Sequence, residues 1–464
     1  MIEKIFIKNY KCFGPKEIEI ELKPLTIFYG PNGSGKSSIL EMIGILAQSA
    51  HNSQKKIGLN FQDELVFIPS DKDAFHKGDL NQSLKLGFAF PFLEEDLRDL
   101  IPVKLSKSRL KFKSLSYLVE YISSTHGVSQ EIYVDHTCLA RNWMQITRRT
   151  KTNFASNTIL EFPIFLSKFK FHAERLDIFS EQSFQLRNLE PFAPARVSIS
   201  DFEKKQAEHL SKFSQAILNA SIAELENVFY LSCERPTFGM LYKPSPSPKM
   251  MWAGRPLWVG RQGERTIQIL SLVLNSNEYR ESARKIRDWA KVFGLPELSA
   301  GVRGEDSIGA DYIDSDFSIP IDYSQAGYGS RQMLTIIVQL FTLKQKSVVM
   351  IEEPEISLHP EAQSKLPLLF ADALQDQNQI IISTHSNIIP LSISRAVHKK
   401  KLRPEDIAVY HLEKTKKGTH TKRLRVNERG YIPGWIPSFA KTEDKLSKEW
   451  FDSIENRSPS QKRK

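Results

Sequence analysis

The chain has 464 residues, 41% of them hydrophobic and 25% charged, which is the composition of a folded globular protein and excludes a wholly disordered chain. Its formal net charge of +10 indicates a polyanionic partner such as nucleic acid. No apolar run approaches the roughly 18 residues of a membrane span, and the N-terminus has no apolar signal segment, so we expect a cytoplasmic protein without a membrane partner. Three widely separated cysteines argue against a disulfide framework and against a structural zinc site.

Short β-rich segments occupy the first thirty residues. Residues 5–7, 17–22 and 25–29 are separated by Gly-Pro and Lys-Pro pairs, which favour turns. The segment 17–22 alternates strictly between glutamate and apolar residues, as expected when one face of a strand meets water. The segment 25–29 is nearly all apolar, which predicts a strand covered on both faces.

A glycine-rich loop follows this apolar strand. Residues 30–37 read Gly-Pro-Asn-Gly-Ser-Gly-Lys-Ser and match the GxxxxGK[ST] pattern in full, and residues 37–43 open a helix. The backbone N–H groups of such a loop and the N-terminus of the helix bind phosphates, so the sequence predicts ATP as the ligand. We expect Lys36 to reach the β- and γ-phosphates and the Ser37 hydroxyl to hold Mg²⁺. The expected nucleotide-binding residues are Gly30, Pro31, Asn32, Gly33, Ser34, Gly35, Lys36, Ser37 and Ser38.

Between about residues 51 and 225 the sequence mixes turns, aromatic clusters and short helix or strand segments. Basic residues there alternate with apolar ones at Lys107, Arg109, Lys111 and Lys113. A strand with this pattern carries either a basic stripe for nucleic acid or lysines that guard a sheet edge, and the sequence does not decide between them. Residues 201–229 contain no helix breaker and predict a helix by their periodicity.

From about residue 228 the pattern alternates between strands and helices. Apolar runs at 348–351, 379–382 and 407–412 predict strands, and residues 331–343 and 360–375 predict helices. Pro367 lacks a backbone donor inside the second helix, so we expect a kink there. These elements predict an α/β protein whose core is interrupted by the long segment after the phosphate loop.

Two adjacent acids end the first of these strands. Glu352 and Glu353 directly follow Val-Val-Met-Ile, and ligands of α/β folds bind at the carboxyl ends of the strands. We expect Glu352 to hold hydrated Mg²⁺ and Glu353 to orient or deprotonate the attacking water. An isolated pair of glutamates is usually a solvated strand end, but this pair shares its chain with a phosphate loop.

Basic residues are concentrated toward the C-terminus. Twelve Lys or Arg residues and only four acids lie between residues 395 and 429. An isolated run of this kind is usually a solvated face. The alternative is a surface that binds DNA or RNA through residues 399–403 and 414–417.

These motifs, in this order, resemble those of ATP-binding-cassette-type ATPases of the SMC-like, RecF-like and OLD (overcoming lysogenization defect) group. The resemblance rests on the loop 30–37 and on residues 259–264, 324–332, 351–360 and 383–386. It implies a P-loop ATPase core formed by residues 1–50 and 225–400, with an N-terminal antiparallel β subdomain. Around this core we place a mixed α+β insertion at 51–224 and a basic C-terminal appendage at 401–464 packed on the core.

The resemblance also implies an oligomer. Residues 324–332 are similar to the family's signature loop, which caps the γ-phosphate bound by the other subunit. The nucleotide contacts implied here are Gly327, Gly329 and Ser330, in a head-to-tail homodimer or a higher even oligomer. The loop departs from the transporter form because Ala-Gly-Tyr-Gly replaces two adjacent glycines.

Three further motifs take their roles from the resemblance. His385 stands where the family has its switch histidine, which hydrogen-bonds the γ-phosphate. Residues 355–360 look like the loop at the dimer interface. Gln262 is a candidate for the loop that senses Mg²⁺, with an exposed polar residue as the equal alternative.

The residues after the switch histidine determine the expected subclass. OLD nucleases carry a metal-dependent nuclease domain there, with a DxD motif, whereas the roughly 78 residues that follow residue 386 contain none. Residues 314–316 form an Asp-Ser-Asp sequence, but they precede the signature loop and predict a turn. The chain therefore resembles OLD-like ATPases without a nuclease domain, such as the Septu-like ATPase subunits of bacterial anti-phage defence systems, which work beside a separate nuclease.

Two other functions compete with this one. An SMC-like or RecF-like clamp closes on DNA in repair or chromosome maintenance, but the insertion is too short and too broken for a long coiled coil. A transporter ATPase needs a membrane partner, and the altered signature loop and the large insertion argue against it. The favoured hypothesis is therefore an ATPase that hydrolyses ATP to ADP and phosphate and regulates a separate nuclease.

Overall fold

The structure describes most of the predicted core and the strands of the long middle segment. This computed structural model describes residues 1–51, 59–91, 114–122, 127–134, 137–146, 154–159, 177–179, 223–235, 257–303, 307–314, 316–374, 377–416, 418–433 and 445–452. The basic stripe at 107–113 and residues 201–222 of the predicted helix lie outside these ranges.

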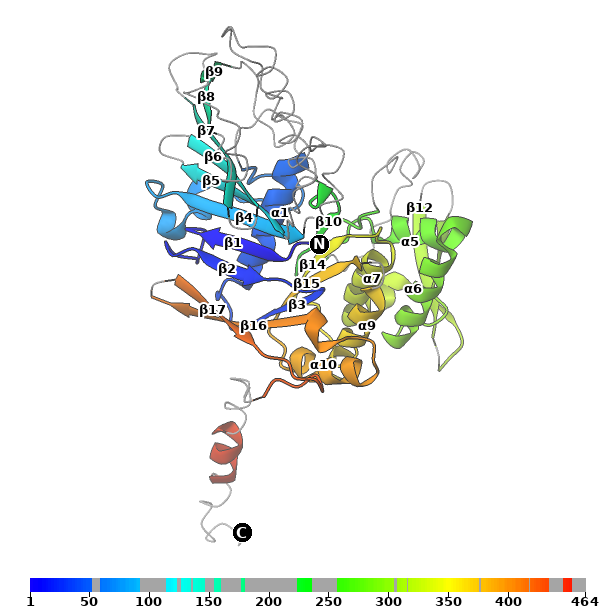
Figure 1. Cartoon of the computed structure of the whole chain (residues 1–464). Coiled ribbons are helices and arrows are strands. Elements are labelled where there is room, and N and C mark those ends of the chain that lie inside the picture. Colours follow the sequence, from blue (N-terminus) through cyan, green and yellow to red (C-terminus); the bar gives the residue numbers. More distant parts are fainter. Residues whose placement is uncertain are drawn as a thin grey trace, which may run out of the picture.

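A six-stranded sheet forms the core (Figure 1). Its order is β10-β14-β15-β3-β16-β17, with five parallel strands and β17 antiparallel at one edge. The strands are β3 (Leu25–Tyr29), β10 (Val228–Leu231), β14 (Val348–Glu352), β15 (Gln379–Thr384), β16 (Ile407–Thr415) and β17 (Gly418–Leu424). β3, β14 and β15 are buried along their whole length, as expected for strands covered on both faces. The predicted α/β class is confirmed.

Two hydrophobic clusters cover the two faces of this sheet. Alternate side chains of β14 divide between them, because successive residues of a strand point to opposite faces. Val348 and Met350 pack with α1 (Lys36–His51), whereas Val349 and Ile351 pack with the helices of the other face. Those helices are α5 (Thr266–Asn275), α6 (Arg280–Val292), α7 (Tyr328–Phe341), α9 (Leu366–Ala373) and α10 (Ile388–His398). Figure 1 shows α1 with the N-terminal strands on one side and these helices on the other.

A second sheet joins the N-terminal strands to the middle segment. Its eight strands are antiparallel in the order β2-β1-β4-β5-β6-β7-β8-β9. They are β1 (Lys4–Lys8), β2 (Ile18–Glu21), β4 (Leu84–Pro91), β5 (Ser114–Ile122), β6 (Gly127–Val134), β7 (Thr137–Ile146), β8 (Phe154–Ile159) and β9 (Asp177–Phe179). Because β1 pairs with both β2 and β4, the boundary expected between residues 50 and 51 falls within elements that share one sheet and one hydrophobic cluster.

Smaller elements complete the described parts of the chain. A three-stranded antiparallel sheet precedes α7 and contains β11 (Ser299–Arg303), β12 (Ser307–Ile313) and β13 (Pro320–Asp322). The short helices are α2 (Asp71–Ala74), η1 (His76–Gly78), η4 (Asn277–Tyr279), η5 (Tyr323–Gln325), α8 (Pro360–Gln363) and η7 (Pro404–Asp406). Among the helices of the described ranges, none is both long enough and apolar enough to cross a membrane.

Two helix predictions need correction. The helix predicted to reach residue 229 does not, because Val228 and Phe229 begin β10 and pair with β14 in the buried sheet. The helix predicted at 360–375 is divided into α8 and α9. Pro367 lies in the first turn of α9, where a missing N–H leaves no hydrogen bond unmade, so the interruption comes before the proline and not at it.

The C-terminal boundary expected at residue 400 also needs correction. β16 pairs in parallel with β3, the strand that leads into the phosphate loop, and β17 pairs with β16. Residues 407–424 are therefore part of the core sheet and not an appendage packed against it. The reason is that the apolar first half of β16 is buried against both hydrophobic clusters.

Candidate active site

The phosphate loop connects β3 to α1, and α1 begins at Lys36, one residue earlier than predicted. Gly33 and Gly35 have φ angles of 70° and 100°, a region that residues with a side chain rarely adopt. A Cβ atom at Gly35 would also approach the Cys12 sulfur to 2.4 Å. The glycines of the motif are thus required by the turn, and the side chains of Pro31, Asn32 and Ser37 remain exposed.

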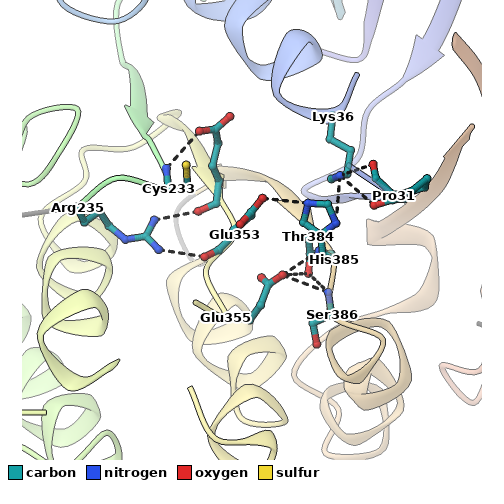
Figure 2. Close-up of polar contacts among 11 residues, drawn as sticks. Pro31, Lys36, Cys233, Arg235, Glu353, Glu355, Thr384, His385 and Ser386 are labelled. Atoms are coloured by element: carbon teal, nitrogen blue, oxygen red, sulfur yellow. Dashed lines mark hydrogen bonds and ion pairs between the residues drawn. The ribbon is translucent and has the colours of Figure 1, made fainter. Parts of the chain in front are cut away.

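Lys36 is the cation of this loop and is only 5% exposed. Its Nζ donates to the carbonyl oxygens of Gly30 at 2.9 Å and Pro31 at 3.0 Å, and it lies 3.5 Å from Nδ1 of His385 (Figure 2). Burial lowers the pKa of Lys36 to about 8, against the opposing effect of nearby glutamates, of which Glu353 is the largest. A buried ammonium group whose partners, among the described residues, are two carbonyl oxygens and an imidazole is suited to bind an anion.

Glu353 and His385 extend this arrangement. Nε2 of His385 lies 3.0 Å from Oε1 of Glu353, so the imidazole stands between the lysine and the carboxylate. The hydrogen bond from His385 lowers the pKa of Glu353, despite partial burial, and the charges of His385, Lys36 and Arg235 add to this effect. The structure therefore brings Lys36 into contact with a pair, His385 and Glu353, that lies more than three hundred residues later in the sequence.

Glu352 and Ser37 are the side chains predicted to hold Mg²⁺. Glu352 is the last residue of β14 and is 6% exposed, and its Oε2 accepts a hydrogen bond from the backbone N–H of Cys233 at 3.2 Å. Glu352 is in register with Ser383 of β15, so the two side chains lie on the same face of the sheet. The Ser34 and Ser383 hydroxyls are buried without a hydrogen-bond partner in the described part of the chain. Hard oxygen donors and unpaired hydroxyls fit a nucleotide with Mg²⁺.

Glu355 fixes the backbone around His385. Its Oε1 accepts hydrogen bonds from the Thr384 hydroxyl at 2.7 Å and from the backbone N–H groups of His385 at 2.8 Å and Ser386 at 3.1 Å (Figure 2). Burial raises the pKa of this carboxyl group, and the three hydrogen bonds oppose the rise. Glu355 was predicted only as part of an interface loop, and the structure instead connects it to the imidazole that contacts Glu353.

The signature-loop residues lie at the start of α7. Gly327 precedes the helix, and Gly329 packs so closely on the interface loop that a Cβ atom would come within 2.5 Å of the Ser357 carbonyl oxygen. Ser330 follows in the first turn. The neighbours of these residues belong to α7, to the interface loop and, for Ser330, to the turn after α6 at Gly294, and none of these contacts is with residues 30–38. The described part of the chain therefore does not bring them to its own phosphate loop.

Gln262 and the two aspartates of the Asp-Ser-Asp sequence lie outside the helices and strands. Gln262 is exposed in a turn between Gly260 and Gly263, next to the end of β10. Its role in sensing Mg²⁺ stays a prediction. Oδ1 of Asp314 accepts from the backbone N–H groups of Asp316 and Phe317, so the described residues 314, 316 and 317 make the contacts of a turn, as predicted. Among the described residues, no group of three or more His, Cys, Asp or Glu side chains is placed to hold a metal ion.

Comparison with known proteins identifies the family. The family described as "AAA ATPase domain" matches residues 1–389, which contain every predicted site residue. The chain belongs to the AAA ATPase domain family. The match ends before β16 and β17, so the two strands that complete the core sheet of this AAA ATPase lie beyond it.

The relatives of this AAA ATPase include an OLD nuclease and a RecF protein. The chain is 24% identical over 398 residues to the OLD nuclease of Thermus scotoductus, covering 84% of this chain and 59% of the relative's length. A 53-residue stretch, 11% of this chain and 15% of the relative, is 45% identical to the DNA replication and repair protein RecF of Acinetobacter baylyi. Among solved structures, an SMC head bound to the C-terminal winged-helix domain of ScpA aligns over 92% of this chain and 98% of its own, with 11% identity and a TM-score of 0.44.

One residue of the AAA ATPase site, Arg235, was not among those predicted from the sequence. Arg235 follows β10 and is 3% exposed, and its guanidinium group binds the backbone carbonyl oxygens of Glu352 at 2.9 Å and Glu353 at 3.0 Å (Figure 2). A signal was present, because Arg235 lies just beyond the apolar run Val228–Leu231, as Glu352 and Glu353 lie beyond theirs. The same rule about strand ends predicts all three residues at one edge of the sheet.

Proposed function

We propose that this AAA ATPase binds ATP with Mg²⁺ and hydrolyses it to ADP and phosphate. The observation that carries the proposal is the contact of Lys36 with His385 and of His385 with Glu353 at the carboxyl edge of the core sheet. An anionic γ-phosphate would replace the Gly30 and Pro31 carbonyls around Lys36, and backbone N–H groups of the loop would bind the other phosphates.

The remaining roles follow from charge and position. Glu353, whose pKa is lowered by its hydrogen bond to His385, orients the attacking water and accepts its proton. His385 donates to the γ-phosphate and loses this partner after cleavage. Ser37 and Glu352 would hold Mg²⁺, which neutralises charge on the phosphates when bound.

The test is phosphate release by the wild type and by Glu353→Gln. The amide keeps the size of the side chain but cannot accept a proton, so we expect the turnover number to fall by about 10²- to 10⁴-fold while ATP still binds. Glu361→Gln is the matched control, since Glu361 is an exposed glutamate that pairs only with Lys365. Equal turnover by Glu353→Gln and wild type would exclude this role for Glu353.

We further propose that two subunits enclose ATP between the phosphate loop of one and the signature loop of the other. Tyr328 in the signature loop is 43% exposed, and a Cβ atom added at Gly327 or Gly329 would meet no atom of residues 30–38. Size-exclusion chromatography of Glu353→Gln should show a dimer, or a higher even oligomer, only with ATP. An oligomeric state that is indifferent to ATP contradicts this proposal.

The biological role that we propose is regulation of a separate nuclease in anti-phage defence. It is supported by the 24% identity to an OLD nuclease, of which this chain spans 59%. The purified chain should then hydrolyse ATP but leave plasmid DNA intact with Mg²⁺ or Mn²⁺. Cleavage that persists through purification and disappears in the double variant Asp314→Asn, Asp316→Asn would refute the separate-nuclease proposal.

A nucleic-acid clamp is the second candidate, and the hairpin of β16 and β17 favours it. Exposed side chains of Lys414, Lys416 and Lys422 lie on this hairpin, and no acid partner is recorded for them in the described part of the chain. The hairpin also contacts the phosphate loop, because Thr419 donates to the Ser34 carbonyl at 2.8 Å. ATP-dependent binding of DNA or RNA without any effect on a nuclease would favour the clamp.

A further inference from the structure

Arg235 is the most completely bonded buried cation in the described core. Its Nη1 donates to the carbonyl oxygens of Ser232 and Glu352, both at 2.9 Å, and its Nη2 donates to that of Glu353 at 3.0 Å. Its Nε donates to Oε1 of Gln332 at 2.5 Å. Burial lowers the pKa of Arg235 to about 10, so the group remains charged at neutral pH. A buried charge is tolerated when its donors find acceptors, and these contacts satisfy four of the five N–H groups of the guanidinium.

The backbone that Arg235 holds is strained. Glu353 has a φ of 42°, in the left-handed region that residues other than glycine rarely adopt. The peptide is fixed on two sides, since the N–H of Glu353 donates to the Ser383 carbonyl oxygen at 2.8 Å and its own carbonyl oxygen accepts from Arg235. This conformation sets the direction of the Glu353 side chain toward His385.

The bond to Gln332 extends the cluster to another element. Gln332 belongs to α7, two residues after the signature residue Ser330, and is 1% exposed. The contact is reciprocal, because Nε2 of Gln332 donates to the backbone carbonyl oxygen of Arg235 at 2.9 Å. A displacement of the first turn of α7 would therefore be carried to the carbonyl group of Glu353 through two side chains.

We propose that Arg235 is a positioning residue that holds Glu353 in its hydrolytic conformation, and that Gln332 couples it to the signature helix. The inference rests on the proposed ATPase function. Arg235 touches no residue of the phosphate loop in the described contacts, so its effect should fall on the chemical step and not on nucleotide binding.

The test uses the full chain with Arg235→Lys, which keeps the charge but cannot reach four acceptors at once. We expect the dissociation constant of a fluorescent ATP analogue and the KM for ATP to change by less than about threefold, while kcat falls by about 100-fold. Arg287→Lys is the matched control, since Arg287 also donates to a backbone carbonyl, that of Leu298, but lies on α6. It should keep wild-type kcat.

Gln332→Glu and Gln332→Met provide a second route if Arg235→Lys fails to fold. Glutamate keeps the acceptor for Arg235 and should retain most of kcat, whereas methionine removes it and should lower kcat by about tenfold with unchanged ATP affinity. Wild-type kcat in both Arg235→Lys and Gln332→Met overturns the inference. A parallel loss of ATP affinity and kcat also overturns it, because that result indicates general disruption. Absence of hydrolysis by the wild type would instead refute the proposed ATPase function.

Discussion

The two ends of the core sheet carry charged residues in different ways. At the carboxyl end, Lys36, His385 and Glu353 contact one another although they come from α1 and from the segments after β15 and β14. At the amino end, basic residues pair with acids close by: Lys401 with Asp372, and Arg403 with Asp406 in the same short helical turn. The first arrangement requires the complete fold. In the second, Arg403 and Asp406 pair within one turn, whereas Lys401 reaches Asp372 of α9, 29 residues earlier in the sequence.

This difference separates a site from a solvated surface. A charge that is buried and faces residues from several elements has lost water and needs a partner, which a ligand can provide. An exposed ion pair within one turn contributes little and is easily replaced by water. The structure also places residues 399–403 and 414–416 at opposite ends of β16, so the two predicted basic runs do not form one continuous patch.

The largest effect is expected from removing the buried cation. Lys36→Ala should abolish measurable ATP binding, because the γ-phosphate loses its only buried lysine partner in the described site. Lys401→Ala, which removes a lysine from the amino end, should bind ATP as the wild type does. Equilibrium binding of a fluorescent ATP analogue measures both. If Lys36→Ala still binds ATP, the carboxyl end of the core sheet is not distinguished from the amino end as the ATP-binding site.

Removal of the His385 imidazole should have the next largest effect, on the rate of ATP hydrolysis. His385→Ala removes the hydrogen bond that holds Glu353 in place, so we expect kcat to fall by about 100-fold with a smaller change in KM. His398→Ala is the control, since His398 is an exposed histidine at the end of α10. If both variants turn over ATP at the wild-type rate, the contact between His385 and Glu353 has no catalytic role.

The pH dependence of ATP affinity should report the protonation of Lys36 without any mutation. The pKa of Lys36 is lowered to about 8, so the group is protonated below that pH and neutral above it. Phosphate binds the protonated form, and ATP affinity should therefore be constant at lower pH and fall by up to about tenfold per unit above pH 8. Lys36→Arg keeps its charge and should lose this dependence. If the ATP affinity of the wild type stays constant up to about pH 9.5, the predicted loss of affinity on deprotonation of Lys36 is contradicted.

The smallest effect concerns the basic surfaces. Reversing Lys414, Lys416 and Lys422 to Glu should weaken binding of a labelled DNA duplex and reduce the slope of log affinity against log salt by about two to three. Reversing Lys399, Lys400 and Lys401 should have less effect, because acids already offset the charge there. Fluorescence anisotropy at several salt concentrations compares the two. If reversal of Lys399, Lys400 and Lys401 weakens DNA binding more, the nucleic-acid surface lies at the amino end of the sheet instead.

The sequence predicted the site better than it predicted the boundaries around it. The phosphate loop and the acids after Val348–Ile351 were predictable because a buried strand and its polar end are adjacent in sequence. The same rule places Arg235 at this edge of the sheet, but it does not predict the contact of Arg235 with the Glu352 and Glu353 carbonyl groups, which arises when β10 pairs with β14, more than one hundred residues away. The expected division at residue 50 failed for the same reason, because β1 pairs with β4 across about eighty residues.

A crystal structure of Glu353→Gln with ATP and Mg²⁺ tests the central claim most directly. We predict that the phosphates lie in the loop 30–38, that Lys36 leaves the Gly30 and Pro31 carbonyls to bind the γ-phosphate, and that His385 contacts the same phosphate. We also predict Mg²⁺ between Ser37 and Glu352. A nucleotide bound elsewhere, with Lys36 still on the two carbonyl oxygens, would contradict the account.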